Sequence, residues 1–272
     1  MSEPAVDAGT GERTDVQPAV LRASNLEKRF GGIVAVDGVS FEIDRATITG
    51  LIGPNGAGKS TTFDLITGVT TPNAGRVYVD GEDVTGLRPD QLVDRGVIRT
   101  FQISRELGGM TVLENVLLAF GSQQGESLWR AVVPGLRRKT VSQERALLER
   151  AWETLELFEL DHLAHEAASN LSGGQRKLLE LARALQTEPE IVLLDEPMAG
   201  VNPTLEATLL ERIHELRSQG YTFLLVEHDM EVVMNHCETV IVMHQGRILT
   251  RGTPEEIRAD EQVIDAYLGG RG

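Results

Sequence analysis

The fold of this chain is constrained most by one glycine-rich segment, Gly53-Pro54-Asn55-Gly56-Ala57-Gly58-Lys59-Ser60, called here the phosphate loop. The segment matches the pattern G-x-x-x-x-G-K-[ST], in which glycines let backbone N–H groups turn inward around phosphate oxygens. Lys59 adds a cation for the terminal phosphates, and the Ser60 hydroxyl is a ligand type that Mg²⁺ accepts. An apolar run at 48–52 precedes the loop, and a helical pattern at 61–67 follows it. The sequence therefore predicts a strand–loop–helix unit whose helix N-terminus binds nucleotide phosphates.

A second candidate site lies where an apolar strand ends in two acidic residues. The run Ile191-Val192-Leu193-Leu194 leads directly into Asp195 and Glu196. Carboxylates at the end of a buried strand are costly unless they meet a cation. We therefore expect Asp195 to bind Mg²⁺ through water and Glu196 to polarise an attacking water as general base. Taken alone, the pattern also fits a strand that runs into a surface loop with solvated acids.

A third candidate site opens an amphipathic helix at Leu171-Ser172-Gly173-Gly174-Gln175. Ser172 and Gln175 have the spacing of a capping box. The two glycines between them leave N–H groups of the first helical turn uncovered, which predicts a second anion site. Two phosphate sites in one chain leave two arrangements open. Either each site takes its own ligand, or two chains share each nucleotide.

The strand-like segments fall into two groups. Alternating apolar residues at 20–26 and 33–44, and a hairpin at 77–84 with Asp80-Gly81 as its turn, predict a small antiparallel unit. Unbroken apolar runs at 48–52, 191–194, 223–226 and 240–243 are typical of a parallel sheet buried on both faces. Residues 111–185 are mostly helical in pattern, and a helix is expected to begin at Pro203 after Asn202. Together these patterns predict an α/β fold.

Composition excludes several classes of protein. The chain carries 41 acidic and 26 basic residues, a net charge of −15, so binding to nucleic-acid phosphates is not expected to be its main activity. No apolar run approaches the length that crosses a bilayer. Cys237 is the sole cysteine, which excludes an internal disulfide and suits a reducing compartment. Residues 1–19 lack apolar periodicity and are expected to form a disordered acidic tail.

The order of these motifs resembles the ATP-binding subunits of ABC transporters, over about residues 20–270. The signature LSGGQ at 171–175 separates that family from other phosphate-loop NTPases. Gln102 resembles the glutamine of the family's Q-loop, His228 the histidine of its H-loop, and Phe30 the aromatic residue that stacks on adenine. Asn202 departs from the general family pattern, which has Asp there. Outside this resemblance, a lone Gln, His or Phe is an ordinary structural residue.

The resemblance implies a single phosphate-loop NTPase domain over 20–272, of the RecA-like ABC ATPase fold. An antiparallel β subdomain and a helical subdomain, inserted at about 103–172, would complete it. The chain would bind ATP and Mg²⁺ and hydrolyse ATP. Three residues would hold the metal, namely Ser60, Gln102 and Asp195, and three would act in catalysis, namely Gln102, Glu196 and His228. The nucleotide would contact Phe30, Gly53, Pro54, Asn55, Gly56, Ala57, Gly58, Lys59, Ser60 and Thr61.

The resemblance also implies partners. A second ABC ATPase subunit, identical or different, would pair head-to-tail, so that Ser172, Gly173, Gly174 and Gln175 face the γ-phosphate held by its phosphate loop. Separate membrane permease subunits would hold the chain on the cytoplasmic face of the membrane, and an extracytoplasmic protein would bind the solute. Arg130, Arg137, Arg138 and Lys139 form a basic cluster that fits either a solvated loop or a contact with permease acids or anionic lipid.

The segment 99–116, the ending VIDAYLGG and Ala-Gly-x-Asn-Pro at 199–203 look like importer subunits for branched-chain amino acids. Importers of urea or amides and exporters of lipopolysaccharide are close alternatives, because no residue here would touch the solute. A soluble ABC ATPase for DNA repair or translation would carry a long coiled-coil insertion or two ATPase domains, and the chain has neither. Glu196 and His228 argue against a non-catalytic nucleotide sensor.

Overall fold

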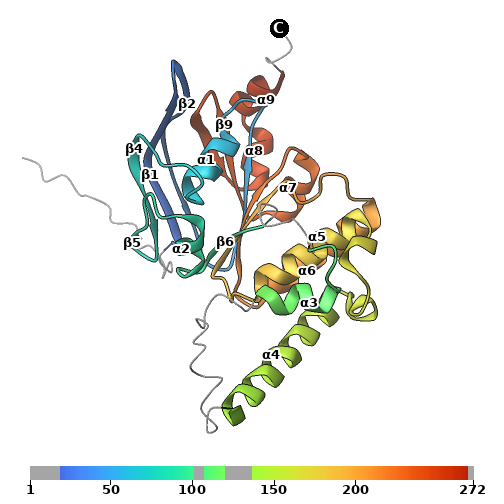
Figure 1. The fold of residues 1–272 in the computed structure, drawn as a ribbon. Coiled ribbons are helices and arrows are strands. Elements are labelled where there is room, and N and C mark those ends of the chain that lie inside the picture. Colours follow the sequence, from blue (N-terminus) through green and yellow to red (C-terminus); the bar gives the residue numbers. More distant parts are fainter. Residues whose placement is uncertain (1–18, 101–106, 120–136, 269–272) are drawn as a thin grey trace, which may run out of the picture.

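The computed structural model describes residues 19–100, 107–119 and 137–268. Its described part contains two sheets with helices packed between and beside them (Figure 1). Residues 1–18 of the predicted acidic tail, Gln102 and Arg130 lie outside these residues. The other members of the basic cluster fall within 137–144, where only the backbone is described.

The smaller sheet is antiparallel, with the strand order β2-β1-β4-β5. Asp80 and Gly81 both have positive φ, 49° and 77°, which is the geometry of the predicted two-residue hairpin turn between β4 and β5. The antiparallel unit predicted from alternation is therefore confirmed. The strands are β1 (Leu21–Phe30), β2 (Ile33–Ile43), β4 (Ala74–Val79) and β5 (Glu82–Asp83).

The central sheet has the order β10-β9-β3-β8-β7-β6, and all neighbours except β9 and β10 run parallel. The four apolar runs form its middle strands, as predicted. The sequence did not reveal β6, which is three residues long, or β10, whose residues are half-buried or exposed. The strands are β3 (Ile48–Ile52), β6 (Val97–Arg99), β7 (Ile191–Asp195), β8 (Thr222–Val226), β9 (Thr239–His244) and β10 (Arg247–Gly252).

Alternate residues of the central strands enter two different cores. Ile48 and Leu194 belong to a core shared with α3, α4, α5, α6 and α7, whereas Leu51 and Leu193 face α1 and the antiparallel sheet. Burial on both faces explains why these strands read as unbroken apolar runs. The helices are α1 (Lys59–Ile66), α2 (Pro89–Val93), α3 (Val112–Leu118), α4 (Arg137–Leu157), α5 (Gly173–Leu185), α6 (Pro203–Ser218), α7 (Met230–His236), α8 (Pro254–Ala259) and α9 (Glu261–Leu268), with short 3₁₀ turns at Asp161–Leu163 and Ala168–Asn170.

The helix starts follow the polar caps that the sequence contains. The side chains of Thr111, Ser172 and Thr253 each accept a hydrogen bond from the backbone N–H three residues further on. The Glu or Gln side chain at that position in turn accepts a hydrogen bond from the backbone N–H of the cap residue. Asn202 caps α6 in the same way, with its side-chain oxygen 3.0 Å from Leu205 N. Helix α4 projects away from both sheets (Figure 1). No helix of the described residues is long and apolar enough to cross a membrane.

Candidate nucleotide site

The phosphate loop follows β3 and is shaped by glycines that no other residue could replace. A Cβ on Gly53, at φ 151°, would lie 2.2 Å from the Met243 carbonyl oxygen. A Cβ on Gly58, at φ 99°, would lie 2.5 Å from the Ala35 carbonyl oxygen. Backbone hydrogen bonds from Ala57 to Pro54 and from Gly246 to Ala57 close the loop further. The loop is therefore held from both sheets.

Lys59 lies at the start of α1 with its ammonium turned into the loop. Its Nζ donates to the carbonyl oxygens of Gly53 at 2.6 Å and Pro54 at 3.3 Å. Burial lowers the pKa of Lys59, and the carboxylate of Glu196 opposes that shift. The cap residue Gly58 provides no side chain for the N–H groups of the first turn. A buried cation beside uncovered N–H groups is a fitting cradle for phosphate.

Asp195 ends β7 and is joined to α1 by an arginine. The nearly buried guanidinium of Arg99 donates to Asp195 Oδ2 at 2.6 Å and to Asp64 Oδ1 at 2.6 Å. Its face lies over the ring of Phe63, 4.8 Å from the centroid. Arg99 thus ties the helix after the phosphate loop to the strand that carries the acidic pair. Ser60 is exposed on the first turn of α1.

Glu196 follows Asp195 directly in the chain, and its side chain is exposed. Its φ is 48°, in the left-handed region that residues other than glycine seldom adopt, and its N–H donates to Val226 O at 2.9 Å. Strain of this kind persists where the surroundings fix the backbone, and it clusters at functional sites. Arg99 joins Asp64 of α1 to Asp195, the residue before Glu196, and the Glu196 carboxylate acts on the pKa of Lys59, so the two sequence motifs lie near each other.

His228 lies just after β8, and a buried glutamate holds its backbone. Glu227 is 1% exposed and accepts hydrogen bonds from His228 N–H at 3.2 Å and Met198 N–H at 3.0 Å. Burial raises the pKa of Glu227, the two backbone donors oppose the shift, and Glu196 adds to it. The His228 ring is exposed. Glu227 thereby joins the strand end at His228 to the turn after Glu196.

The signature segment occupies the N-terminus of α5. Ser172 Oγ accepts from Gln175 N–H at 3.3 Å, and Gln175 Oε1 accepts from Ser172 N–H at 2.9 Å, which confirms the capping box. Gly173 is exposed with open space around its Cα, whereas a Cβ on Gly174 would lie 2.4 Å from Leu205 Cδ1. Among the described residues, no hydrogen bond or ion pair joins 172–175 to the phosphate loop.

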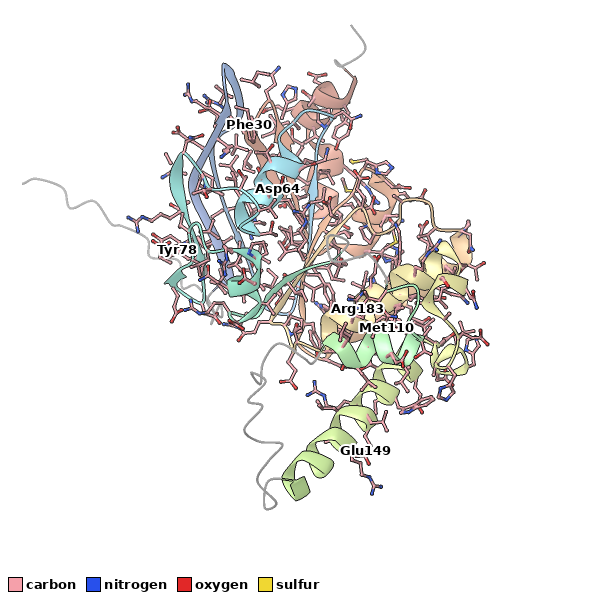
Figure 2. The ribbon with its side chains drawn as sticks, in the orientation of Figure 1. Phe30, Asp64, Tyr78, Met110, Glu149 and Arg183 are labelled. Carbon is pink, nitrogen blue, oxygen red and sulfur yellow. The ribbon has the colours of Figure 1, made fainter. Side chains whose placement is uncertain are left out.

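Phe30 ends β1 at the turn into β2, on the opposite side of the molecule from Glu149 on α4 (Figure 2). Its ring is 52% exposed, and Lys28 Nζ lies 5.3 Å from the ring centroid. The exposure of Phe30 is compatible with stacking on a base, and its role stays a prediction. Gln102, the remaining predicted catalytic residue, lies outside the described residues.

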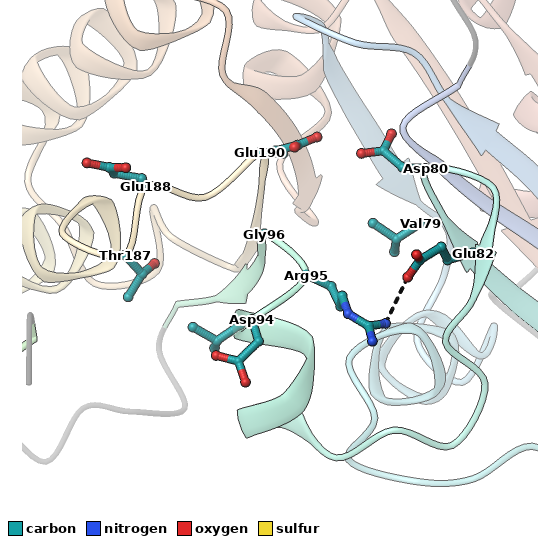
Figure 3. Close-up of a pocket in the computed structure, with 10 residues that line it drawn as sticks. Val79, Asp80, Glu82, Asp94, Arg95, Gly96, Thr187, Glu188 and Glu190 are labelled. Carbon is teal, nitrogen blue, oxygen red and sulfur yellow. Dashed lines mark ion pairs between the residues drawn. The ribbon is translucent and has the colours of Figure 1, made fainter. Parts of the chain in front are cut away.

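A groove of about 470 Å³ lies elsewhere, at the amino ends of β6 and β7 (Figure 3). Five carboxylates line it, and three arginines pair with four of them: Arg95 with Glu82 at 3.0 Å, Arg150 with Glu188 at 2.6 Å, and Arg45 with Asp80 and Glu190. A groove of this charge repels phosphate. The phosphate loop, Asp195 and Glu227 all lie at the opposite, carboxyl ends of the strands, where open α/β sheets bind ligands. The lining carboxylates belong to Asp80, Glu82, Asp94, Glu188 and Glu190.

Comparison with known families matches residues 36–199 to the ABC transporter model. The chain belongs to the ABC transporter family. It is an ATP-binding cassette and hydrolyses ATP, as the motif order in its sequence implied. A second model, described as branched-chain amino acid ATP-binding cassette transporter, matches residues 247–272.

Curated relatives match nearly the whole cassette. A probable branched-chain amino acid transport ATP-binding protein LivG of Methanocaldococcus jannaschii is 39% identical over 92% of this chain and 97% of its own length. High-affinity branched-chain amino acid transport ATP-binding proteins BraF of Pseudomonas aeruginosa and LivG of Escherichia coli K12 are 41% and 43% identical, each over 92% of this chain and 98% of their own.

Solved structures confirm the fold. A nucleotide-free ATP-binding cassette from an ABC transporter superposes with a TM-score of 0.79 at 38% identity, covering 92% of this chain and 99% of its own. An ATP-binding cassette in its ADP conformation superposes with a TM-score of 0.80 at 36% identity, covering 93% of this chain and 100% of its own. The cassette of this chain therefore has the nucleotide-binding fold that its sequence predicted.

The C-terminal segment of the cassette reaches the phosphate loop. Tyr267 on α9 packs on the main core, and its phenol lies close to the backbone of Gly53. Burial raises the pKa of Tyr267 to about 12, which keeps the phenol protonated. One residue of the segment that the branched-chain family model matches therefore lies beside the phosphate loop. Sequence analysis did not single out Tyr267, although it lies within the segment VIDAYLGG that suggested the importer.

Proposed function

We propose that this cassette powers the import of branched-chain amino acids through separate permease subunits. The observation that carries the solute assignment is the match of residues 247–272 to the branched-chain model, in a chain whose curated relatives are named for that transport. The permeases and an extracytoplasmic binding protein select the solute, and the cassette supplies the energy. The chain then works as a peripheral subunit on the cytoplasmic face of the membrane.

In the proposed reaction, residues of the phosphate loop and Thr61 hold the phosphates of ATP. Lys59 turns from the loop carbonyls toward the terminal phosphates, a movement of one flexible side chain. Glu196 accepts a proton from the attacking water, and His228 donates a hydrogen bond to the γ-phosphate. Gln102 approaches the same water. The exposed ring of Phe30 stacks on adenine.

The donor set of this site suits Mg²⁺. Ser60 offers a hydroxyl and Asp195 a carboxylate, and hard oxygen ligands are what Mg²⁺ prefers. The ion, when bound, neutralises phosphate charge. Arg99 donates to one carboxylate oxygen of Asp195, and the other oxygen is the one available to the ion in this proposal. Gln102 is the third ligand in this proposal.

We propose that two cassettes pair head-to-tail, so that each nucleotide meets two chains. The support is the separation within one chain, where 172–175 makes no described hydrogen bond or ion pair to the phosphate loop. Ser172, Gly173, Gly174 and Gln175 of one cassette then face the γ-phosphate on the partner. Closure of the pair on ATP and opening after hydrolysis then move the permease.

The solute assignment is tested by uptake in cells that lack the chromosomal copy of this gene. Plasmid-borne wild-type chain should restore uptake of radiolabelled leucine, isoleucine and valine, and Glu196→Gln should not. Urea and a short amide serve as alternative solutes. Restored uptake of urea or an amide, with leucine uptake unchanged by the deletion, would assign the cassette to that other importer. Loss of lipopolysaccharide from the cell surface in the deletion would assign it to export.

A further inference from the structure

The turn that carries Glu196 is held by more than its own backbone. Residues 196–199 connect β7 to the segment before α6, and Glu196 itself has the left-handed φ of 48°. Within the turn, Ala199 N–H donates to Glu196 O at 3.1 Å. A single internal hydrogen bond does not maintain such a backbone, so its surroundings must.

Lys177 supplies that support from helix α5. Its Nζ donates to three carbonyl oxygens of the turn, those of Ala199 at 2.6 Å, Pro197 at 2.7 Å and Glu196 at 3.3 Å. An ammonium has three N–H donors, and each of these oxygens accepts one. Hydrogen bonds from a charged donor are stronger than neutral ones. Burial lowers the pKa of Lys177, and the carboxylates of Glu180, Glu227 and Glu196 oppose that shift.

Glu227 holds the same turn from its other side. Its buried carboxylate accepts the N–H of Met198 at 3.0 Å, while its second oxygen accepts the N–H of His228 at 3.2 Å. The carbonyls of the turn thus point to a cation from α5, and its central N–H points to an anion from the end of β8. This arrangement leaves the backbone that carries Glu196 little freedom to move without displacing Lys177 or Glu227.

We propose that Lys177 is a positioning residue for Glu196 and makes the orientation of this carboxylate depend on helix α5. The proposal rests on the proposed roles of Glu196 as general base and Ser172 as a partner-facing residue. Because Ser172 caps the same helix that carries Lys177, contact with the partner's nucleotide at one end of α5 is transmitted to Glu196 of the same chain. Lys177 then links the two nucleotide sites of a pair.

The test compares Lys177→Met with Lys177→Arg in the full-length chain. The methionine removes the charge and all three donors, whereas the arginine keeps a charged donor for the carbonyls. We expect Lys177→Met to lower ATP turnover about 10- to 100-fold, the scale of a small misplacement of a reacting group. ATP affinity should stay unchanged because Lys59 is intact. Lys177→Arg should recover most of the turnover. Arg145→Met, which removes an exposed cation paired with Glu149 on α4, is the control for loss of charge.

A double-mutant cycle separates positioning from general destabilisation. If Lys177 acts through Glu196, adding Lys177→Met to Glu196→Gln should leave the residual turnover unchanged. The proposal would be overturned if Lys177→Met lowered the residual turnover of Glu196→Gln by the same factor as it lowers wild-type turnover. Wild-type turnover in Lys177→Met, or failure of Lys177→Arg to recover turnover, would also overturn it. Thermal unfolding shows whether Lys177→Met is folded. If it is not, Lys177→Gln replaces it in the same cycle, because glutamine keeps one donor group without the charge. A wild-type rate in Glu196→Gln alone would instead refute the proposed role of Glu196.

Discussion

The two phosphate-binding segments of the cassette are built differently. The phosphate loop is clamped between the sheets, needs glycine at Gly53 and Gly58 to avoid neighbouring carbonyls, and contains the buried ammonium of Lys59. The signature segment is an exposed helix start whose polar groups satisfy one another, and the lysine of its helix turns to the 196–199 turn instead. A rigid cradle with its own cation can bind phosphate alone. A helix start without its own cation needs the phosphate to be held in place by another site. This is the physical basis for expecting two chains at each nucleotide.

Removing the general base should have the largest effect on catalysis and none on either cradle. Glu196→Gln should lower ATP turnover roughly 10²–10⁴-fold, since the amide cannot accept the proton of the attacking water. ATP binding should persist and the ATP-bound pair should accumulate, visible as a stable dimer on size-exclusion chromatography. Hydrolysis at the wild-type rate would remove Glu196 from the mechanism.

Removing the cation should disable the phosphate loop alone. Lys59→Ala deletes a charged donor from the cradle, and we expect ATP affinity to fall about 10- to 100-fold, the range of one lost charge-assisted hydrogen bond. Direct titration with a fluorescent ATP analogue measures the change. Lys28→Ala, which removes a lysine near Phe30, distinguishes phosphate from base contacts, because its effect should be smaller and should depend on the base. Unchanged affinity in Lys59→Ala is incompatible with the phosphate-loop assignment.

A methyl group at Gly174 should strain the signature segment by packing and leave the phosphate loop intact. The added Cβ would approach Leu205 Cδ1 to 2.4 Å and Leu205 Cβ and Cγ to 3.2 Å, so the Leu205 side chain must move and its Cβ must shift slightly away from α5. We expect Gly174→Ala to lower the free energy of unfolding by about 1–3 kcal/mol. Urea denaturation measures this loss, and Leu205→Ala in the same chain should recover part of it. If Leu205→Ala gives no recovery, the contact between α5 and α6 is not the cause.

The smallest effect concerns the thiol behind the phosphate loop. A Cβ on Gly50 of β3 would lie 3.1 Å from Cys237 Sγ, and burial raises the pKa of Cys237 to about 12. At pH 8 only about one thiol in 10⁴ is then ionised, and iodoacetamide should label the folded chain very slowly at any ATP concentration. Urea-unfolded chain should react quickly. Rapid labelling of the folded chain would show that the strand behind the loop opens.

Most of the fold and much of the site follow from local patterns. The four apolar runs, the Asp80-Gly81 turn and the cap at Ser172 each carry their structure within a few residues, and each was confirmed. Sequence analysis missed Arg99, Lys177, Glu227 and Tyr267, because their partners are distant along the chain. Each borders a recognised motif, and Lys177 is one of only four lysines in the chain.

Packing contacts between helices are harder to predict for the same reason. Nothing in LSGGQ indicates that Gly174 lies against Leu205, because the contact depends on how α5 and α6 approach each other. The motif therefore has a structural requirement at Gly174 beside its proposed role at phosphate. The roles of the remaining site residues stay predictions, and Gln102 lies outside the described residues.

A set of serine variants isolates the role of the signature segment. Ser172→Arg places a bulky cation where the partner's γ-phosphate would lie. Ser172→Ala removes the same helix cap without adding bulk, and Ser218→Arg makes the same substitution at an exposed serine at the end of α6. Each is combined with Glu196→Gln, so that any ATP-bound dimer persists long enough to be measured.

The most direct measurement compares ATP affinity and ATP-dependent dimerisation in Glu196→Gln with and without Ser172→Arg. Affinity is titrated at protein concentrations where both chains are monomeric, and dimerisation is followed by size exclusion with light scattering. We predict equal monomer affinity, within about twofold, and complete loss of the dimer only when Ser172→Arg is present. Loss of ATP binding by the Ser172→Arg monomer would contradict the account, because both phosphate sites would then serve one nucleotide in one chain.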